Sequence, residues 1–144
     1  YIQQGELLHN LFAYIRTSDD VLMALKRLRM EGVITSDAQE KEIQKLATWA
    51  LGHPKVKDWF SGNWELFNEC TIISTEKGQI KTHRPDRVMM KDGQVIVVDF
   101  KFGKKRTSYF NQVREYMSLL ASMGYSNIRG YLWYVFNNEL EEVN

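Results

Sequence analysis

Apolar residues recur every three or four positions through the first 60 residues of the chain, which is the spacing of helices that each bury one face. The spacing predicts four helices, over residues 3–16, 19–31, 36–51 and 54–60. Ser36 followed by Gln39 resembles a capping box at the start of the third helix, and Gly32 and Gly52 end the helices before them. We expect this part of the chain to be a helical scaffold.

From Trp64 onward the pattern alternates and is rich in β-branched and aromatic residues, which is typical of strands. Strands are predicted over residues 64–74, 79–90 and 94–101. The last of these is apolar on both faces, as in a strand that is covered on both sides. Asp92-Gly93 is a two-residue hairpin signal, so we expect Asp86 and Asp99 to face the same side of two antiparallel neighbours.

The remaining pattern predicts one more helix and one more strand. The helix covers residues 107–124, the strand covers 128–136, and 139–144 form a short polar end. After a crossover helix, the last strand can pair parallel to the central one. The predicted fold class is therefore α/β, with a central mixed sheet flanked by helices. We expect a single domain, mostly helical over 1–62 and containing the sheet and crossover helix over 63–144.

Composition adds mainly exclusions. The 19 Lys and Arg residues against 18 Asp and Glu leave a net charge of +1, so any contact with a polyanion depends on local clusters. The single cysteine, Cys70, excludes an intramolecular disulfide and a four-cysteine zinc or iron–sulfur site, and fits a reducing cytoplasm. No apolar run reaches 18 residues and no signal peptide is present, so we expect a cytoplasmic protein with no membrane partner.

The candidate chemistry begins with two charged residues at the end of the central strand. Burying the charge of Asp99 or Lys101 without a partner costs on the order of several kcal/mol or more. Asp86 and Asp99 are suitable ligands for Mg²⁺ or Mn²⁺, and a neighbouring Lys101 could stabilise an anionic transition state or orient a water. On these residues alone, an inert network of Asp99 and Lys101 with Arg84 and Arg87 is an equally good explanation.

Four short motifs in a fixed order extend this picture. They are GELLH at 5–9, Pro-Asp at 85–86, Asp-Phe-Lys at 99–101 and QVREY at 112–116. The combination resembles the PD-(D/E)xK nuclease superfamily, and this resemblance implies a restriction-endonuclease-like core for the α/β fold. Its first and last motifs are similar to the histidine helix and the Gln-x-x-x-Tyr helix of the branch typified by the RecB and AddA helicase-nucleases.

The resemblance implies a role for each matching residue. The implied metal ligands are His9, Asp86, Asp99 and the backbone carbonyl of Phe100. Lys101 would activate or orient the attacking water, and Gln112 and Tyr116 would support Lys101 or the DNA backbone, although on the sequence alone both could simply complete the core. Glu69 is a reserve candidate. DNA phosphates are expected to contact a basic rim of Arg84, Arg87, Lys104, Lys105 and Arg106.

The expected function is Mg²⁺-dependent hydrolysis of DNA, as an exonuclease or endonuclease in double-strand break repair. The resemblance implies a nuclease domain cut from a longer ATP-dependent helicase-nuclease, with DNA, the helicase domains and a partner subunit as partners. No P-loop pattern occurs in the 144 residues, so a motor would lie outside them. Two alternatives stay open: an idle nuclease-like module that binds DNA or docks, and a stand-alone repair or restriction nuclease.

Overall fold

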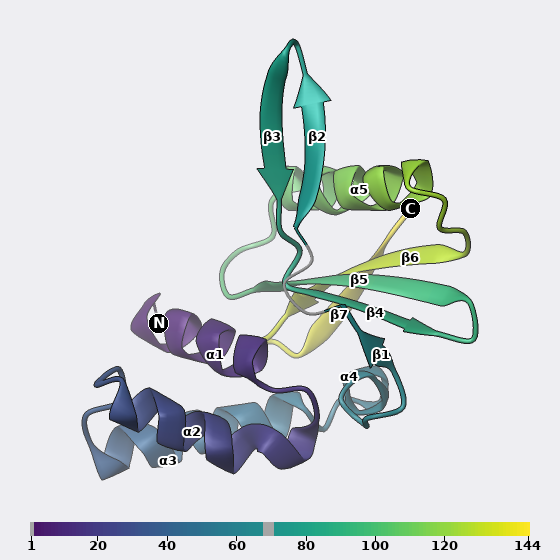
Figure 1. Cartoon of the computed structure of the whole chain (residues 1–144). Coiled ribbons are helices and arrows are strands. Elements are labelled where there is room, and N and C mark those ends of the chain that lie inside the picture. Colours follow the sequence, from purple (N-terminus) through teal and green to yellow (C-terminus); the bar gives the residue numbers. More distant parts are fainter. Residues whose placement is uncertain (1, 68–70) are drawn as a thin grey trace. The chain divides into compact units, whose positions relative to one another are not determined.

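In the computed structural model, which describes residues 2–67 and 71–144, the chain divides into two compact units (Figure 1). The N-terminal unit, Tyr1–Trp64, is helical, and among the described residues all the strands and one helix belong to the C-terminal unit, Glu65–Asn144. The predicted fold class is confirmed: the protein is α/β, with a mixed central sheet and an N-terminal helical segment. No helix within the described residues is both long enough and apolar enough to cross a membrane.

The N-terminal unit contains the four predicted helices and a short 3₁₀ turn. Its elements are α1 (Ile2–Tyr14), η1 (Ser18–Asp20), α2 (Val21–Met30), α3 (Asp37–Ala50) and α4 (Pro54–Trp59). The predicted cap of α3 is present, because the Ser36 hydroxyl accepts a hydrogen bond from the Gln39 N–H at 3.1 Å. Leu8, Leu11 and Phe12 of α1, which recur at helical spacing, are buried.

The C-terminal unit is built on a five-stranded sheet in the order β1-β4-β5-β6-β7. Its strands are β1 (Glu65–Leu66), β4 (Arg87–Lys91), β5 (Gln94–Lys101), β6 (Ile128–Tyr134) and β7 (Glu139–Val143). The central strand β5 pairs antiparallel with β4 and parallel with β6. The predicted crossover is confirmed, since α5 (Thr107–Ser122) connects the two parallel strands.

The β4–β5 hairpin sets the register on which the site depends. Asp92 and Gly93 have φ values of 51° and 80°, as a tight two-residue turn of the I′ kind requires. Arg87 lies opposite Val98, so continuing the ladder by one residue places Asp86 opposite Asp99. The apposition predicted from the sequence is therefore confirmed.

Helix α5 covers the face of the sheet that carries Val88 and Met90 of β4. Val95 and Val97 of β5 pack there with Tyr116 and Leu120 of α5. Gly130 on β6 allows this close approach, because a Cβ at that position would lie 2.5 Å from the Met117 sulfur and 2.6 Å from Val113 Cγ1. Asp99 and Lys101 alternate in step with Val95 and Val97, so they lie on the same face.

Three strand predictions need correction. The strand expected over 64–74 divides into β1 and β2 (Ile72–Glu76), and the one expected over 79–90 divides into β3 (Gln79–His83) and β4. Pro85 lies in the second break, where it cannot donate to a ladder, and β2 and β3 form a separate two-stranded sheet. The expected polar end is the strand β7, which pairs with β6. Glu69 lies outside the described residues.

Candidate active site

Two carboxylates meet where the β4–β5 ladder ends. The Asp86 N–H donates to Asp99 Oδ1 at 3.2 Å, and the Phe100 N–H donates to Asp86 Oδ2 at 2.8 Å. Asp99 is 3% exposed and Asp86 is half-buried. The backbone of each strand therefore holds the side chain of the other, and this fixes the two carboxylates next to each other.

The environment of Asp99 is unfavourable to its negative charge. Burial, and secondly the charge of Asp86, raise the pKa of the Asp99 carboxyl to about 6. The charge of Lys101 and the hydrogen bond from the Asp86 N–H act in the opposite direction and offset part of this shift. A buried pair of carboxylates whose charges repel is a site that a cation would stabilise.

Lys101 is held beside this pair from three directions. Its Nζ lies 3.6 Å from Asp99 Oδ2 and donates to Gln112 Oε1 at 3.2 Å. The same ammonium lies 4.3 Å from the ring centroid of Tyr109. A lysine restrained in this way presents its charge at a defined place beside the carboxylates.

Helix α5 contributes the rest of the cluster. Gln112 and Tyr116 are one turn apart on the helix, so they lie on the same side of it. Burial of Tyr116, and then the charges of Asp99 and Asp86, raise the pKa of its phenol, while a side-chain hydrogen bond with Gln112 opposes the shift. The phenol therefore stays protonated at neutral pH and can donate a hydrogen bond. The structure thus brings together five predicted residues: Asp86, Asp99, Lys101, Gln112 and Tyr116.

One neighbour of this cluster was not predicted. His83, at the end of β3, lies 2.9 Å through Nε2 from the Ser74 hydroxyl and 3.5 Å from Glu115 Oε1. Its ring meets the Tyr116 ring edge-on, with the centroids 6.2 Å apart. The Lys77-Gly78 turn was a usable signal, because it sets the β2–β3 register that places Ser74 and His83 on one face.

The predicted basic residues separate into two groups. Arg84, Lys104 and Arg106 are exposed. Lys105 is also exposed, but its Nζ lies 3.3 Å from Glu139 and 3.7 Å from Glu141 on β7. Arg87 is 5% exposed and therefore offers almost no surface to a ligand in this structure.

Two predicted metal ligands remain predictions. His9 is a half-buried residue of α1 and belongs to the N-terminal unit, whereas the two aspartates belong to the C-terminal unit. The Phe100 N–H donates to Asp86 Oδ2, which places this backbone beside the pair. The predicted role of the Phe100 carbonyl as a metal ligand does not follow from that hydrogen bond. Within the described part of the C-terminal unit, no three His, Cys, Asp or Glu side chains are grouped so that they could hold a metal ion.

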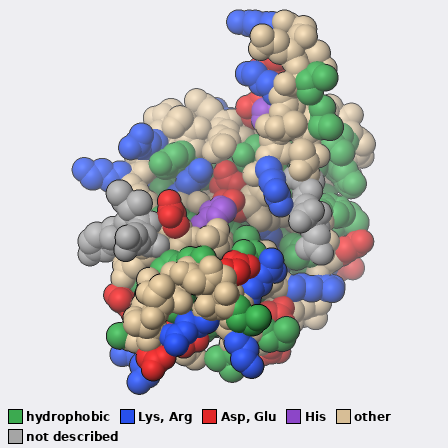
Figure 2. Space-filling view, turned by 60° about the vertical axis from the view of Figure 1, so that its left-hand side comes forward, with side chains coloured by type: hydrophobic (Ala, Val, Ile, Leu, Met, Phe, Trp, Pro, Cys, Tyr) green, Lys and Arg blue, Asp and Glu red, His purple; other side chains and the backbone are tan. Residues whose placement is uncertain are grey.

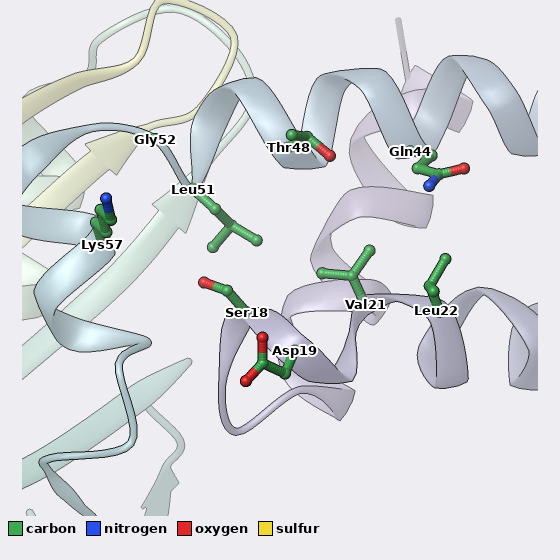
Figure 3. A pocket seen from close by; sticks show the side chains of 9 residues that line it. All are labelled: Ser18, Asp19, Val21, Leu22, Gln44, Thr48, Leu51, Gly52 and Lys57. Atoms are coloured by element: carbon green, nitrogen blue, oxygen red, sulfur yellow. The ribbon is translucent and has the colours of Figure 1, made fainter.

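A separate hollow of about 500 Å³ lies within the N-terminal unit (Figure 3). Gln44 and Thr48 of α3 point toward Val21 and Leu22 of α2 across it. Its wall is mixed and contains only one acid and one base among its nine lining residues, so it does not concentrate reactive groups as the aspartate pair does.

Comparison with known proteins gives no family assignment. No family model and no curated protein matches the chain. The resemblance to the PD-(D/E)xK superfamily therefore stays a prediction, and the geometry around Asp86 and Asp99 is the basis for a functional proposal.

Proposed function

We propose that this protein is a Mg²⁺-dependent nuclease that hydrolyses phosphodiester bonds in DNA. The observation that carries the proposal is the aspartate pair with Lys101 beside it, on the face of the sheet that α5 covers. The three charged residues come from two strands, and α5 adds Gln112 and Tyr116 to them. This combination supports membership of the PD-(D/E)xK superfamily and its RecB/AddA branch.

The aspartate pair fits a hard divalent cation. Asp86 and Asp99 offer carboxylate oxygens, which Mg²⁺ and Mn²⁺ prefer, and the pKa of Asp99 is raised first by burial and secondly by the charge of Asp86. In the proposal these two residues hold the ion, together with the Phe100 carbonyl. A bound cation supplies charge neutralisation at the phosphate and makes an attacking water more acidic.

Lys101 acts beside the pair on the phosphate or the water. Gln112, Asp99 and the Tyr109 ring surround its ammonium, and in the proposal its N–H groups donate to a phosphate oxygen or orient the water. Because Gln112 and the Tyr109 ring restrain the side chain, it needs little reorganisation when charge develops. Tyr116 keeps its proton and can donate to the same anionic group or to Gln112.

The DNA backbone is proposed to contact the exposed cations Arg84, Lys104 and Arg106. Arg87 is left out of this set because it is buried, and Lys105 because it lies against Glu139 and Glu141. A cytoplasmic location, helicase domains in the same longer chain and a partner subunit are carried over from the resemblance and are part of the proposal.

The decisive experiment is a cleavage assay on single-stranded and double-stranded DNA with Mg²⁺ or Mn²⁺. We expect the wild type to cleave and the variants Asp86→Ala and Lys101→Ala to lose about 100-fold or more of its rate. Lys45→Ala, at an exposed position of α3, is the matched lysine control and should cleave as the wild type does. No cleavage by the wild type with either ion, or full activity of Lys101→Ala, would contradict the proposal.

An idle DNA-binding module is the second candidate. It is favoured by the observation that each carboxylate already accepts a backbone hydrogen bond and that Lys101 lies beside Asp99, as in an inert network. Calorimetric titration with Mn²⁺ separates the two candidates. If the protein is an enzyme, the wild type gives a Mn²⁺-binding isotherm that Asp86→Ala abolishes. If it is an idle module, the protein binds DNA but does not cleave it.

A further inference from the structure

The β2–β3 hairpin is a separate structural element of the C-terminal unit. Its two five-residue strands pair only with each other among the described strands, and they are joined by the tight turn at Lys77 and Gly78. Figure 1 shows the hairpin standing out from the five-stranded sheet and α5. A two-stranded ribbon by itself is marginally stable in water, so its retention as a projecting arm calls for a reason.

The two faces of the hairpin differ. On one face, Ile72 is buried in the core and Glu76 pairs with Lys81 at 2.7 Å. The register places four β-branched residues on the opposite face: Ile73, Thr75, Ile80 and Thr82. Ile73 is 68% exposed and Ile80 is 75% exposed, so two large apolar side chains are presented to solvent at diagonal positions of the same face.

The root of the hairpin is part of the candidate active site. His83 contacts Ser74 on the neighbouring strand and Glu115 on α5, and its ring packs edge-on against Tyr116. From His83 the chain continues through two residues to Asp86. The hairpin therefore leads along the chain directly to the end of β4 that carries the aspartate pair.

The charge of the hairpin suits a polyanion. Over residues 71–84 the basic side chains are Lys77, Lys81 and Arg84, against the single acid Glu76. The whole chain, in contrast, has a net charge of only +1. Figure 2 shows the hairpin at the top of the view, with basic side chains at its end and apolar ones along it. Basic side chains beside an apolar strip match a nucleic acid, which presents phosphates next to bases and sugars.

We propose that the β2–β3 hairpin is an arm that lies in a groove of duplex DNA and guides it to the aspartate pair; this rests on the proposed nuclease function. A two-stranded ribbon fits the major groove, which is about 12 Å wide. Strands of this length extend about 17 Å, roughly half a helical turn of the duplex. Ile73 and Ile80 would contact base edges and thymine methyls, while Lys77 and Arg84 would contact phosphates.

The test is fluorescence anisotropy of a labelled 30-base-pair duplex in EDTA and in Ca²⁺. The double variant Ile73→Thr/Ile80→Thr keeps β-branched residues in the strands but removes the apolar contact, and we expect it to bind about 5- to 10-fold more weakly. Leu22→Thr/Met23→Thr replaces an equally exposed apolar pair on α2 and should bind as the wild type does. Lys77→Gln, at the tip, should reduce the slope of log affinity against log salt concentration by about one unit, as expected for the loss of one phosphate contact.

Each outcome separates the arm from the nuclease. If the hairpin variant loses affinity and the wild type cleaves nothing, the arm stands and the nuclease proposal fails. If the wild type cleaves DNA and the hairpin variants bind the duplex with unchanged affinity, the proposal of a DNA-binding arm is overturned and the nuclease proposal stands. If both proposals are right, the hairpin variant cleaves 4-nitrophenyl thymidine phosphate at the wild-type rate but cleaves long duplex more slowly.

Discussion

Asp86 and Asp99 are bound to each other through the backbone: the N–H of Asp86 donates to Asp99, and the N–H that follows Asp99 donates to Asp86. The pair is therefore part of the β4–β5 ladder and not a chance contact between two flexible side chains. The fold keeps the two charges together even though burial and repulsion oppose this. Such an arrangement lowers stability in return for a preorganised site.

The raised pKa of Asp99 predicts how stability depends on pH. The folded carboxyl has a pKa of about 6 and an unfolded aspartate one of about 3.9, so the folded state binds the proton more tightly. Stability is therefore lost as pH rises from about 4 to about 6 and stays lower above that. In EDTA at pH 7.5 we expect Asp99→Asn to raise the free energy of unfolding by about 2–3 kcal/mol.

Urea denaturation at pH 7.5 and pH 4 measures this effect. The advantage of Asp99→Asn should shrink to about 0.5 kcal/mol at pH 4, where the wild-type carboxyl is protonated in the folded state and about half protonated in the unfolded state. Glu65→Gln, which neutralises an exposed carboxylate on β1, is the control and should stay within about 0.5 kcal/mol of the wild type. A less stable Asp99→Asn at pH 7.5 would show that its charge does not oppose folding.

Divalent ions should stabilise the folded protein. At a concentration 100-fold above its Kd, an ion that binds only the folded state contributes about 2.7 kcal/mol. For a chain of 144 residues this raises Tm by roughly 5–10 °C. Differential scanning calorimetry with Mn²⁺ should show this rise in the wild type and none in Asp86→Ala. Glu141→Gln, on β7, removes a carboxylate outside the pair and should keep the rise.

Gln112 should act on the rate through Lys101. Gln112→Ala removes the acceptor that holds the ammonium, and we expect kcat to fall by up to about 100-fold while the Mn²⁺ isotherm is unchanged. Gln112→Glu keeps an acceptor for Lys101 and should retain more activity than the alanine variant. Asn111→Ala, at an exposed position of the same helix, should have the wild-type kcat. Equal rates for the alanine variant and the wild type would remove Gln112 from the site.

Gly130 should be sensitive to a single added methyl group. Gly130→Ala places a Cβ 2.6 Å from the β-branched Val113, which has little freedom on a helix, so α5 must move away from the sheet. We expect a loss of about 1–3 kcal/mol in urea denaturation. Gly103→Ala is the matched control, because nothing lies within 4 Å of its added Cβ. Similar losses of unfolding free energy in both variants would mean that α5 is not tightly packed against Gly130.

The parts of the site that depend on turn residues and helix periodicity could be predicted from the sequence. Asp92-Gly93 prefers positive φ values, so the sequence determined the hairpin, its register and the apposition of Asp86 and Asp99. The 3.6-residue period of α5 placed Gln112 and Tyr116 on one side of the helix. Their meeting with Lys101 depends on the crossover, and was expected only from the resemblance to a family.

Other parts could not be predicted because they depend on which sheet a strand joins. Ile73 and Ile80 alternate with polar residues as in a half-buried strand, yet both are exposed on a separate ribbon. Arg87 resembled a surface cation but lies within β4, where the sheet buries it. The glutamates near the chain end looked like a solvated tail, although they lie on a strand that pairs with β6.

That last strand has a consequence for how the protein behaves in concentrated solution. β7 is an edge of the sheet and carries Glu139, Glu141 and Glu142, and the opposite edge, β1, is only two residues long. A second molecule that tried to extend the sheet at β7 would bring its own row of glutamates against the first, and at β1 it would find almost no ladder to join. The five-stranded sheet is thus protected at both ends from growing into a fibre.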